Sequence, residues 1–131
     1  MIENQKNNMK EIRKGELNLR NYELLKSIHE VIHFINKEGL TFLYISRDNC
    51  SVCHALFPQV IDLLKHYSKI KLGSVKADDV EEVASYFSIF TVPVLLFFLD
   101  GKEMLREARI VHLDLLEEKI NKMYLGVYGD R

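Results

Sequence analysis

The chain has 131 residues, of which 47% are hydrophobic and 28% are charged, with a formal net charge of -1. This length and composition predict one globular domain that buries its own core. The near-neutral charge gives no reason to expect nucleic acid or an acidic membrane surface as a partner. No stretch approaches the roughly 18 apolar residues of a membrane-spanning helix, and the first residues lack the apolar run of a signal peptide. We therefore expect a cytoplasmic protein without membrane attachment.

The beginning of the chain predicts an arm followed by a helix. Residues 1–14 are polar and lack periodicity, which is typical of a solvated arm. Residues 15–19 alternate weakly and suggest a short edge strand. From about residue 21 to residue 37, apolar side chains recur at helical spacing, and Gly39 follows as a stop signal. This pattern predicts a helix with one buried face.

The middle of the chain predicts two strands, each followed by a helix. Leu40–Ser46 is a run of β-branched and aromatic residues without polar alternation, which indicates a strand covered on both faces. The next helix, over about residues 55–67, contains Pro58, so we expect a kink there. A weaker strand over residues 71–77 and a helix over residues 79–87 follow.

The last part of the chain predicts a β-hairpin and a closing helix. Residues 94–99 form the second strongly apolar run, and Asp100-Gly101 is a strong hairpin signal. An amphipathic strand is expected over residues 103–110 and a helix over about residues 113–124. This order predicts an α/β protein whose central mixed sheet of four to five strands is flanked by about four helices. The predicted arm, domain and tail are residues 1–14, 15–125 and 126–131.

Both cysteines of the chain lie between the first apolar strand and the helix after it. Cys50 and Cys53 are three positions apart where this helix opens, and two thiols at that spacing can form a disulfide with little backbone movement. A thiol there also feels the positive N-terminus of the helix. Because paired cysteines are seldom structural staples in the cytoplasm, we expect these two to be catalytic, redox-sensing or metal-binding.

Thiol–disulfide exchange would give the two cysteines different roles. It proceeds by attack of a thiolate on a disulfide sulfur, through a mixed disulfide. Cys50, at the helix start after a polar loop, is the exposed candidate and the one with the lower pKa. Cys53, one turn further on, would be shielded and would resolve the mixed disulfide by attacking Cys50. His54 is expected on the helix surface, where its protonated ring could favour the Cys50 thiolate.

Three other interpretations of the same stretch stay open. The thiols could be buried side chains that act only as small apolar groups. Cys50, Cys53 and His54 could bind zinc, but a closed zinc site needs four ligands and the chain has no second cysteine pair. The letters Cys-Ser-Val-Cys-His also match the attachment pattern for c-type haem, although such chains are normally exported and largely helical. We therefore expect no metal and no other cofactor.

The surroundings of the cysteines give the chain a family resemblance. A strand, Cys50-Ser51-Val52-Cys53, a helix with Pro58, and Thr91-Val92-Pro93 before an apolar strand and an Asp-Gly hairpin together resemble the thioredoxin family over most of the chain. The resemblance implies a thioredoxin fold in which Pro93 has a cis peptide bond and faces the two cysteines. The Val92 backbone would then be free to pair with an extended substrate segment.

Several positions depart from the usual thioredoxin pattern. Asn49 stands where a tryptophan usually precedes the first cysteine. Tyr44 stands at the place of a buried aspartate thought to handle the proton of the resolving thiol, although a tyrosine hydroxyl is far less acidic. Tyr44 could relay a proton through water or fill the core, and we expect core filling. Tyr44 and His54 are our candidates for tuning the cysteine pKa values. The residues expected to contact substrate are Asn49, Val92, Pro93 and Arg109, the last of which replaces a usual glycine.

The sequence therefore predicts a thioredoxin-like thiol–disulfide oxidoreductase that works mainly as a protein-disulfide reductase. The resemblance implies that it acts on protein disulfides and is recycled by a flavoprotein disulfide reductase or a low-molecular-weight thiol. We expect a monomer, and the departures predict a slower or more selective enzyme. The alternative is a redox-sensing or partner-binding module with little turnover, which Tyr44 and Arg109 favour.

Overall fold

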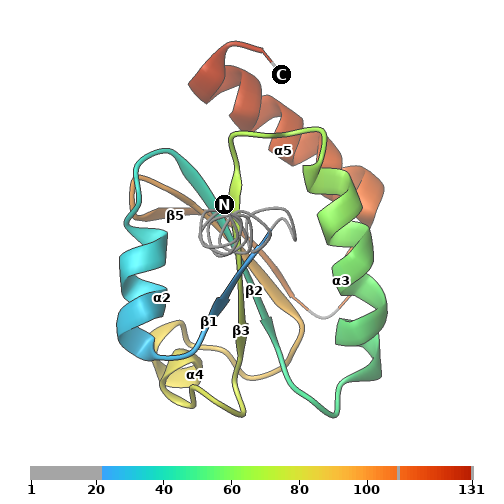
Figure 1. Ribbon diagram of the computed structural model, residues 1–131. Coiled ribbons are helices and arrows are strands. Elements are labelled where there is room, and N and C mark those ends of the chain that lie inside the picture. Colours follow the sequence, from blue (N-terminus) through green and yellow to red (C-terminus); the bar gives the residue numbers. More distant parts are fainter. Residues whose placement is uncertain (1–21, 109, 131) are drawn as a thin grey trace, which may run out of the picture.

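Strands and helices alternate along most of the chain and form a sheet with helices on both faces (Figure 1). The computed structural model describes residues 22–108 and 110–130. Helices α2 and α4 lie on one side of the sheet, and α3 and α5 lie on the other. The elements in chain order are β1 (Glu23–Leu25), α2 (Ile28–Ile35), β2 (Leu40–Ser46), α3 (Ser51–Leu64), β3 (Lys71–Lys76), α4 (Glu82–Tyr86), β4 (Val94–Leu99), β5 (Lys102–Ala108) and α5 (Leu113–Tyr128).

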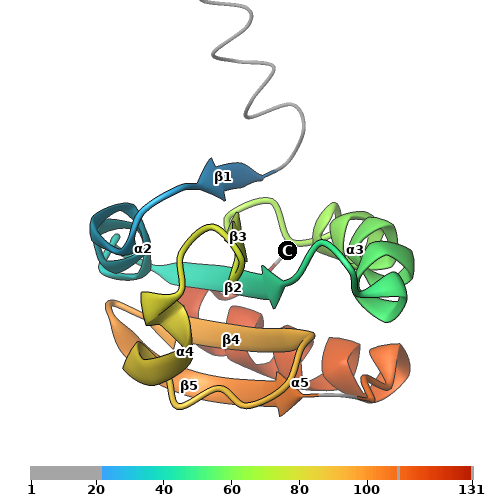
Figure 2. The same ribbon diagram turned by 90° about the horizontal axis from the view of Figure 1, so that it is seen from below.

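The sheet is mixed and has five strands in the order β1-β3-β2-β4-β5 (Figure 2). Strands β1 and β2 run parallel to β3, whereas β4 runs antiparallel to both β2 and β5. The parallel pair β2 and β3 is joined by α3, because parallel neighbours need a crossover connection. The predicted mixed sheet flanked by helices is confirmed, and its two most apolar strands, β2 and β4, lie side by side.

Two hydrophobic cores lie on the two faces of the sheet. Leu40, Phe42 and Tyr44 of β2 pack with residues of α3 and α5. Leu43 and Ile45 pack on the other face with residues of α2 and α4. Successive side chains of a strand point to opposite faces, so a strand covered on both faces reads as an unbroken apolar run. This alternation places Tyr44 on the face that carries the cysteines.

The predicted helix over residues 21–37 is wrong in its first part. Residues of this stretch form strand β1, which pairs with β3 at the edge of the sheet. Helix α2 starts after Ser27, whose hydroxyl accepts a hydrogen bond from the Glu30 N–H at 3.1 Å. Such a cap satisfies one of the N–H groups that a helix leaves unpaired at its start. The strand expected over residues 15–19 lies outside the described residues.

The predicted hairpin between β4 and β5 is confirmed. Asp100 and Gly101 both have positive φ, at 49° and 86°, as a type I′ turn requires. The turn is fastened to the start of β2, because the Gly39 N–H donates to the Asp100 carboxylate at 2.7 Å. The Asp100-Gly101 signal therefore marked the position of the turn.

Three further helices have boundaries that differ from the prediction. Helix α3 covers Ser51–Leu64 rather than about residues 55–67. Helix α4 begins at Glu82 rather than near residue 79, and its N-cap residue makes no side-chain hydrogen bond. Helix α5 continues to Tyr128, whose hydroxyl accepts a hydrogen bond from the Leu40 N–H at 2.9 Å. The first residues of the expected tail are therefore helical, while the division into arm, domain and tail stays a prediction. Within the described ranges, no helix is long and apolar enough to cross a membrane.

Candidate active site at the start of α3

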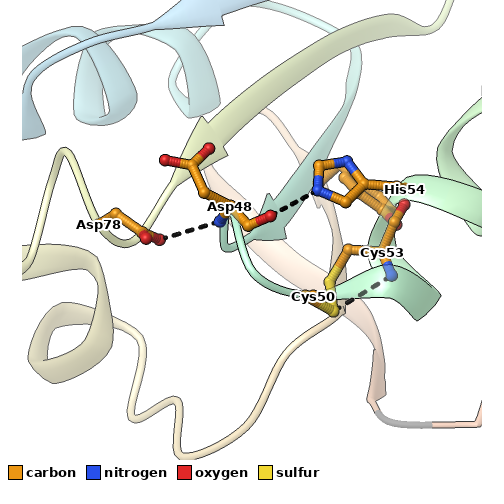
Figure 3. Close-up of a disulfide and its surroundings, with 6 residues drawn as sticks. Asp48, Cys50, Cys53, His54 and Asp78 are labelled. Atoms are coloured by element: carbon orange, nitrogen blue, oxygen red, sulfur yellow. Dashed lines mark hydrogen bonds between the residues drawn. A yellow bond between two sulfur atoms is a disulfide. The ribbon is translucent and has the colours of Figure 1, made fainter.

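Both cysteines lie in the first turn of α3. Cys50 is the N-cap residue, with an extended backbone, and its sulfur accepts a hydrogen bond from the Cys53 N–H at 3.1 Å (Figure 3). A sulfur thus takes the place of the oxygen that usually caps a helix. Because this N–H and the positive helix N-terminus both point at the Cys50 sulfur, they favour a negative charge on it once the disulfide is open.

Cys50 and Cys53 form a disulfide, with their Cα atoms 5.3 Å apart. This separation is within the usual range for bridged cysteines. The two sulfurs differ in access, because Cys50 is half-buried whereas Cys53 is only 1% exposed. The Cys50 sulfur is therefore the one that a partner molecule can reach.

The loop before Cys50 is braced from two directions. The His54 ring bonds the Asp48 carbonyl oxygen through Nε2 at 2.7 Å, so this nitrogen must carry the proton. The Asp48 N–H donates to the Asp78 carboxylate at 3.3 Å (Figure 3). The Asp48 carboxylate also pairs with Lys76 at 2.9 Å, and this hydrogen bond and charge raise the pKa of Lys76. The loop is thus tied to both α3 and the end of β3.

A groove of about 610 Å³ lies beside the Cys50 sulfur. The Val92–Pro93 peptide bond is cis, and both residues line this groove together with Asn49. Three of the four predicted substrate contacts are therefore brought together with the disulfide. The fourth, Arg109, lies outside the described residues.

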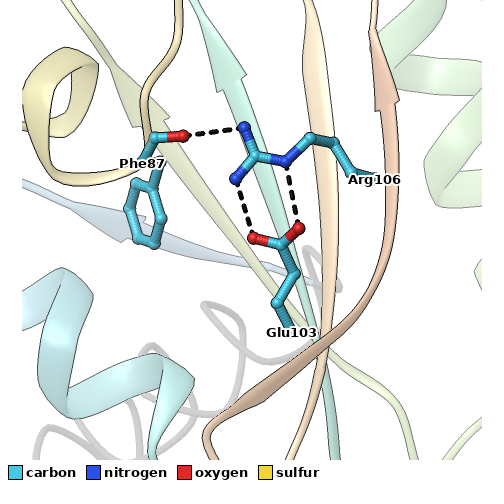
Figure 4. A network of polar contacts seen from close by, with 3 residues as sticks. All are labelled: Phe87, Glu103 and Arg106. Atoms are coloured by element: carbon cyan, nitrogen blue, oxygen red, sulfur yellow. Dashed lines mark hydrogen bonds and ion pairs between the residues drawn. The ribbon is translucent and has the colours of Figure 1, made fainter.

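Arg106 of β5 holds the segment between α4 and the groove, residues 88–91. The Arg106 guanidinium donates to the Phe87 carbonyl oxygen at 2.7 Å and to both carboxylate oxygens of Glu103 at 3.0 and 2.7 Å (Figure 4). Paired contacts of this kind fix the plane of the guanidinium. Because Phe87 closes α4, the contact fixes the start of the segment that ends at Val92 and Pro93.

Tyr44 lies directly behind the disulfide. Its hydroxyl donates to the Cys53 carbonyl oxygen at 2.7 Å, and its ring packs against Phe57 with the centroids 4.8 Å apart. The side chain is fully buried, and this burial raises the pKa of Tyr44 far above the usual range. The hydroxyl therefore keeps its proton at neutral pH and acts as a donor. Ser74 of β3 is the register partner of Tyr44.

Comparison with known proteins settles the family. The family model of thioredoxin matches residues 26–122, which include the disulfide, the groove and all but the last turns of α5. The chain belongs to the thioredoxin family. Its fold and its Cys50–Cys53 disulfide make it a thioredoxin-like thiol–disulfide oxidoreductase, as the sequence predicted.

Relatives and solved structures agree with this assignment. The chain is 52% identical over 106 residues to the thioredoxin-like protein YdfQ of Bacillus subtilis, covering 81% of this chain and 95% of the relative. It is 30% identical over 84 residues to a thioredoxin of Chlamydia caviae, covering 64% of this chain and 82% of that protein. The structure of Fasciola hepatica thioredoxin superposes with a TM-score of 0.70 at 26% identity, covering 77% of this chain and 98% of the other.

Sequence reasoning missed two large, exposed apolar residues of the groove. Val52 and Ile110 line it beside Cys50 and are 58% and 76% exposed. Large exposed apolar side chains next to a reactive group often mark a binding surface. Val52 lies between the cysteines, and its apolar character could have served as a signal. Ile110 follows β5, and only the fold brings it to the groove.

The metal-binding interpretation finds no support in the described part of the chain. No three of its histidine, cysteine, aspartate and glutamate side chains come together in a way that could hold a metal ion. Cys50 and Cys53 are joined to each other, and the His54 ring is turned toward the Asp48 carbonyl (Figure 3). The atoms that could bind a metal are therefore engaged in other contacts, namely a disulfide and a hydrogen bond.

Proposed function

We propose that this protein is a cytoplasmic protein-disulfide reductase that works through the Cys50–Cys53 pair. The observation that carries the proposal is the difference in access between the two sulfurs, one half-buried at the helix start and the other buried behind it. Such an arrangement suits one cysteine that meets the substrate and a second that attacks the first. The electron donor would be a flavoprotein disulfide reductase or a low-molecular-weight thiol, and the protein would act as a monomer.

In the proposed cycle, the reduced dithiol transfers two electrons to the substrate disulfide. The Cys50 thiolate attacks one substrate sulfur, which forms a mixed disulfide and releases the other substrate sulfur as a thiolate. The Cys53 thiolate then attacks the Cys50 sulfur, which closes the Cys50–Cys53 disulfide and releases the second substrate thiolate. Both substrate thiolates take up protons, so one disulfide is reduced to two thiols while the protein dithiol is oxidised.

The groove suggests how a protein substrate would bind. An extended segment could pair with the Val92 main chain beside Pro93, as an added strand pairs with a sheet edge. The apolar side chains of Val52 and Ile110 would contact residues next to the substrate disulfide. Phe90 is 94% exposed and lies three residues before Pro93, within about 10 Å by chain length. These contacts favour substrates with apolar residues near the reactive sulfur.

Reduction of a protein disulfide such as insulin tests the proposal. Wild-type protein should reduce insulin in the presence of a dithiol donor, and Cys50→Ser should be inactive. Cys53→Ser should accumulate a mixed disulfide that a reductant cleaves, because it lacks the second sulfur. Equal activity of wild type and Cys50→Ser would remove the basis of the proposal.

A second candidate is a redox-sensing or partner-binding module of the same family with little turnover. It is favoured by Tyr44, whose hydroxyl is protonated and donates to a carbonyl oxygen, so that it is not available to accept the proton of Cys53. This candidate predicts a reversible Cys50–Cys53 disulfide, negligible insulin reduction and one dominant partner captured by Cys53→Ser. Several captured partners together with steady turnover would support the reductase instead.

A further inference from the structure

We propose that Tyr44 is a positioning residue for the resolving step, an inference that rests on the proposed function. In this role its hydroxyl holds the main chain of Cys53 so that the Cys53 sulfur faces Cys50 while the mixed disulfide is resolved. The residue would act through geometry alone. The hydrogen bond of Tyr44 would thus take the place of the acid–base aspartate that thioredoxins usually have at this position.

The main chain of Cys53 is held at both of its polar groups. Its N–H donates to the Cys50 sulfur at 3.1 Å, and its carbonyl oxygen accepts from the Tyr44 hydroxyl at 2.7 Å. The same peptide unit carries the His54 N–H, which donates to the Cys50 carbonyl oxygen at 3.2 Å. A chain of hydrogen bonds thus runs from Tyr44 through the Cys53–His54 peptide to Cys50. Bonds in such a chain polarise and strengthen one another.

Tyr44 is a rigid anchor for this chain of bonds. It lies on β2, where it is flanked in register by Ser74 of β3 and Leu95 of β4. Its ring is buried and packs against Phe57, one turn beyond Cys53. The first turn of a helix lacks the full set of internal hydrogen bonds, so contact with the central strand adds what the helix itself cannot supply. Small errors in the placement of reacting atoms cost large factors in rate.

A role in proton transfer does not fit the surroundings of Cys53. Burial keeps the Tyr44 hydroxyl protonated, and among the described residues the buried polar side chains besides tyrosines are Thr41 and Ser74. The titratable groups next to the first turn point elsewhere, with His54 bonded to the Asp48 carbonyl oxygen and the Asp48 carboxylate paired with a lysine. The described residues therefore offer no side-chain base for the Cys53 proton, and the proposal assigns this proton to solvent.

The proposed step balances without any further reactant. The Cys53 thiol loses its proton to solvent, and its thiolate attacks the Cys50 sulfur of the mixed disulfide. A new bond forms between the two protein sulfurs as the bond between Cys50 and the substrate sulfur breaks. The substrate sulfur leaves with the electron pair and takes a proton from solvent. Tyr44 neither gives nor takes a proton in this sequence.

Reaction of the reduced protein with a chromogenic aromatic disulfide, a dithiobis-nitrobenzoate, separates the two chemical steps. The first coloured thiolate reports attack by Cys50, and the second reports resolution by Cys53. In Tyr44→Phe, which removes one oxygen atom, we expect an unchanged first phase and a second phase slowed about fivefold to tenfold, as loss of one hydrogen bond implies. The second-phase rate should rise with pH at the wild-type slope, because ionisation of Cys53 limits both proteins.

Tyr124→Phe is the matched control. Tyr124 is equally buried, and its hydroxyl accepts a hydrogen bond from the Lys69 N–H at 3.1 Å. It lies near the far end of α3, a helix of 14 residues and therefore about 20 Å long. This variant should lose similar stability and keep both phases unchanged.

Three results would overturn the positioning role of Tyr44. The first is a second phase in Tyr44→Phe that is as fast as in the wild type, and the second is an equal slowing of that phase in Tyr124→Phe. The third is a changed shape of the pH profile of the second-phase rate in Tyr44→Phe, which would indicate proton transfer. Failure of the proposed function looks different in the same assay. In that case the wild type lacks a second phase, or Cys50→Ser retains the first.

Discussion

Ile110 offers a quantitative test of how a protein substrate is held. It lines the groove beside the disulfide and is 76% exposed, so about three quarters of its side chain is available to a partner. Full burial of an isoleucine side chain contributes roughly 1.5–3 kcal/mol, and three quarters of this is about 1–2 kcal/mol. Ile110→Ser should therefore lower kcat/KM for insulin reduction about fivefold to thirtyfold.

The assay compares a large and a small substrate. Reduction of a small aromatic disulfide should be unchanged in Ile110→Ser, because such a molecule needs little more than access to the Cys50 sulfur. The change in free energy of unfolding should stay within about 0.5 kcal/mol, since the side chain is exposed. Leu115→Ser is the control, because Leu115 is 54% exposed but does not line the groove. An unchanged rate for insulin, or an equal loss for both substrates, would refute the reasoning.

Three further predictions follow from buried or braced groups. Among the described residues, the Thr41 hydroxyl is buried without a hydrogen-bond partner. Thr41→Val should therefore raise the free energy of unfolding, measured by urea titration, by about 1 kcal/mol. A urea midpoint below that of the wild type would contradict this. Arg106→Met removes the donor to the Phe87 carbonyl oxygen. Because this contact holds the start of the segment before Val92, the rate of amide hydrogen exchange in residues 88–91 should rise several-fold, while the rate in β2 stays constant. Burial raises the pKa of Tyr44 above its value of about 10 in the unfolded chain. Stability should therefore fall as pH rises through that value, and the fall should be shallower in Tyr44→Phe; equal alkaline slopes would show that Tyr44 is not responsible.

Much of the fold could be predicted because its signals are local. The unbroken apolar runs of β2 and β4 indicate strands covered on both faces, and the Asp100-Gly101 pair indicates the turn after β4. The position of Cys50 and Cys53 at the start of a helix could also be predicted, because it depends on neighbouring residues alone. These features need no knowledge of what packs against them.

Other features depend on contacts between distant parts of the chain. Strand β1 has apolar spacing that also fits a helix, and only its pairing with β3 brings Leu25 next to Gly73. A Cβ at Gly73 would lie 2.9 Å from Leu25 and 2.8 Å from Phe34, so both side chains pack against bare backbone. The hydrogen bond from Tyr44 to Cys53 is equally invisible in the sequence, because it depends on how α3 is placed over the sheet.

The contact between Tyr128 and the start of β2 has a practical consequence for protein production. A chain cut after residue 125, at the predicted end of the domain, would leave the Leu40 N–H without its partner, although Leu40 is only 1% exposed. It would also remove a ring that packs on Tyr124 with the centroids 4.8 Å apart. Shortened versions should therefore retain Tyr128, and a purification tag at this end should follow a spacer that leaves the last turn of α5 intact.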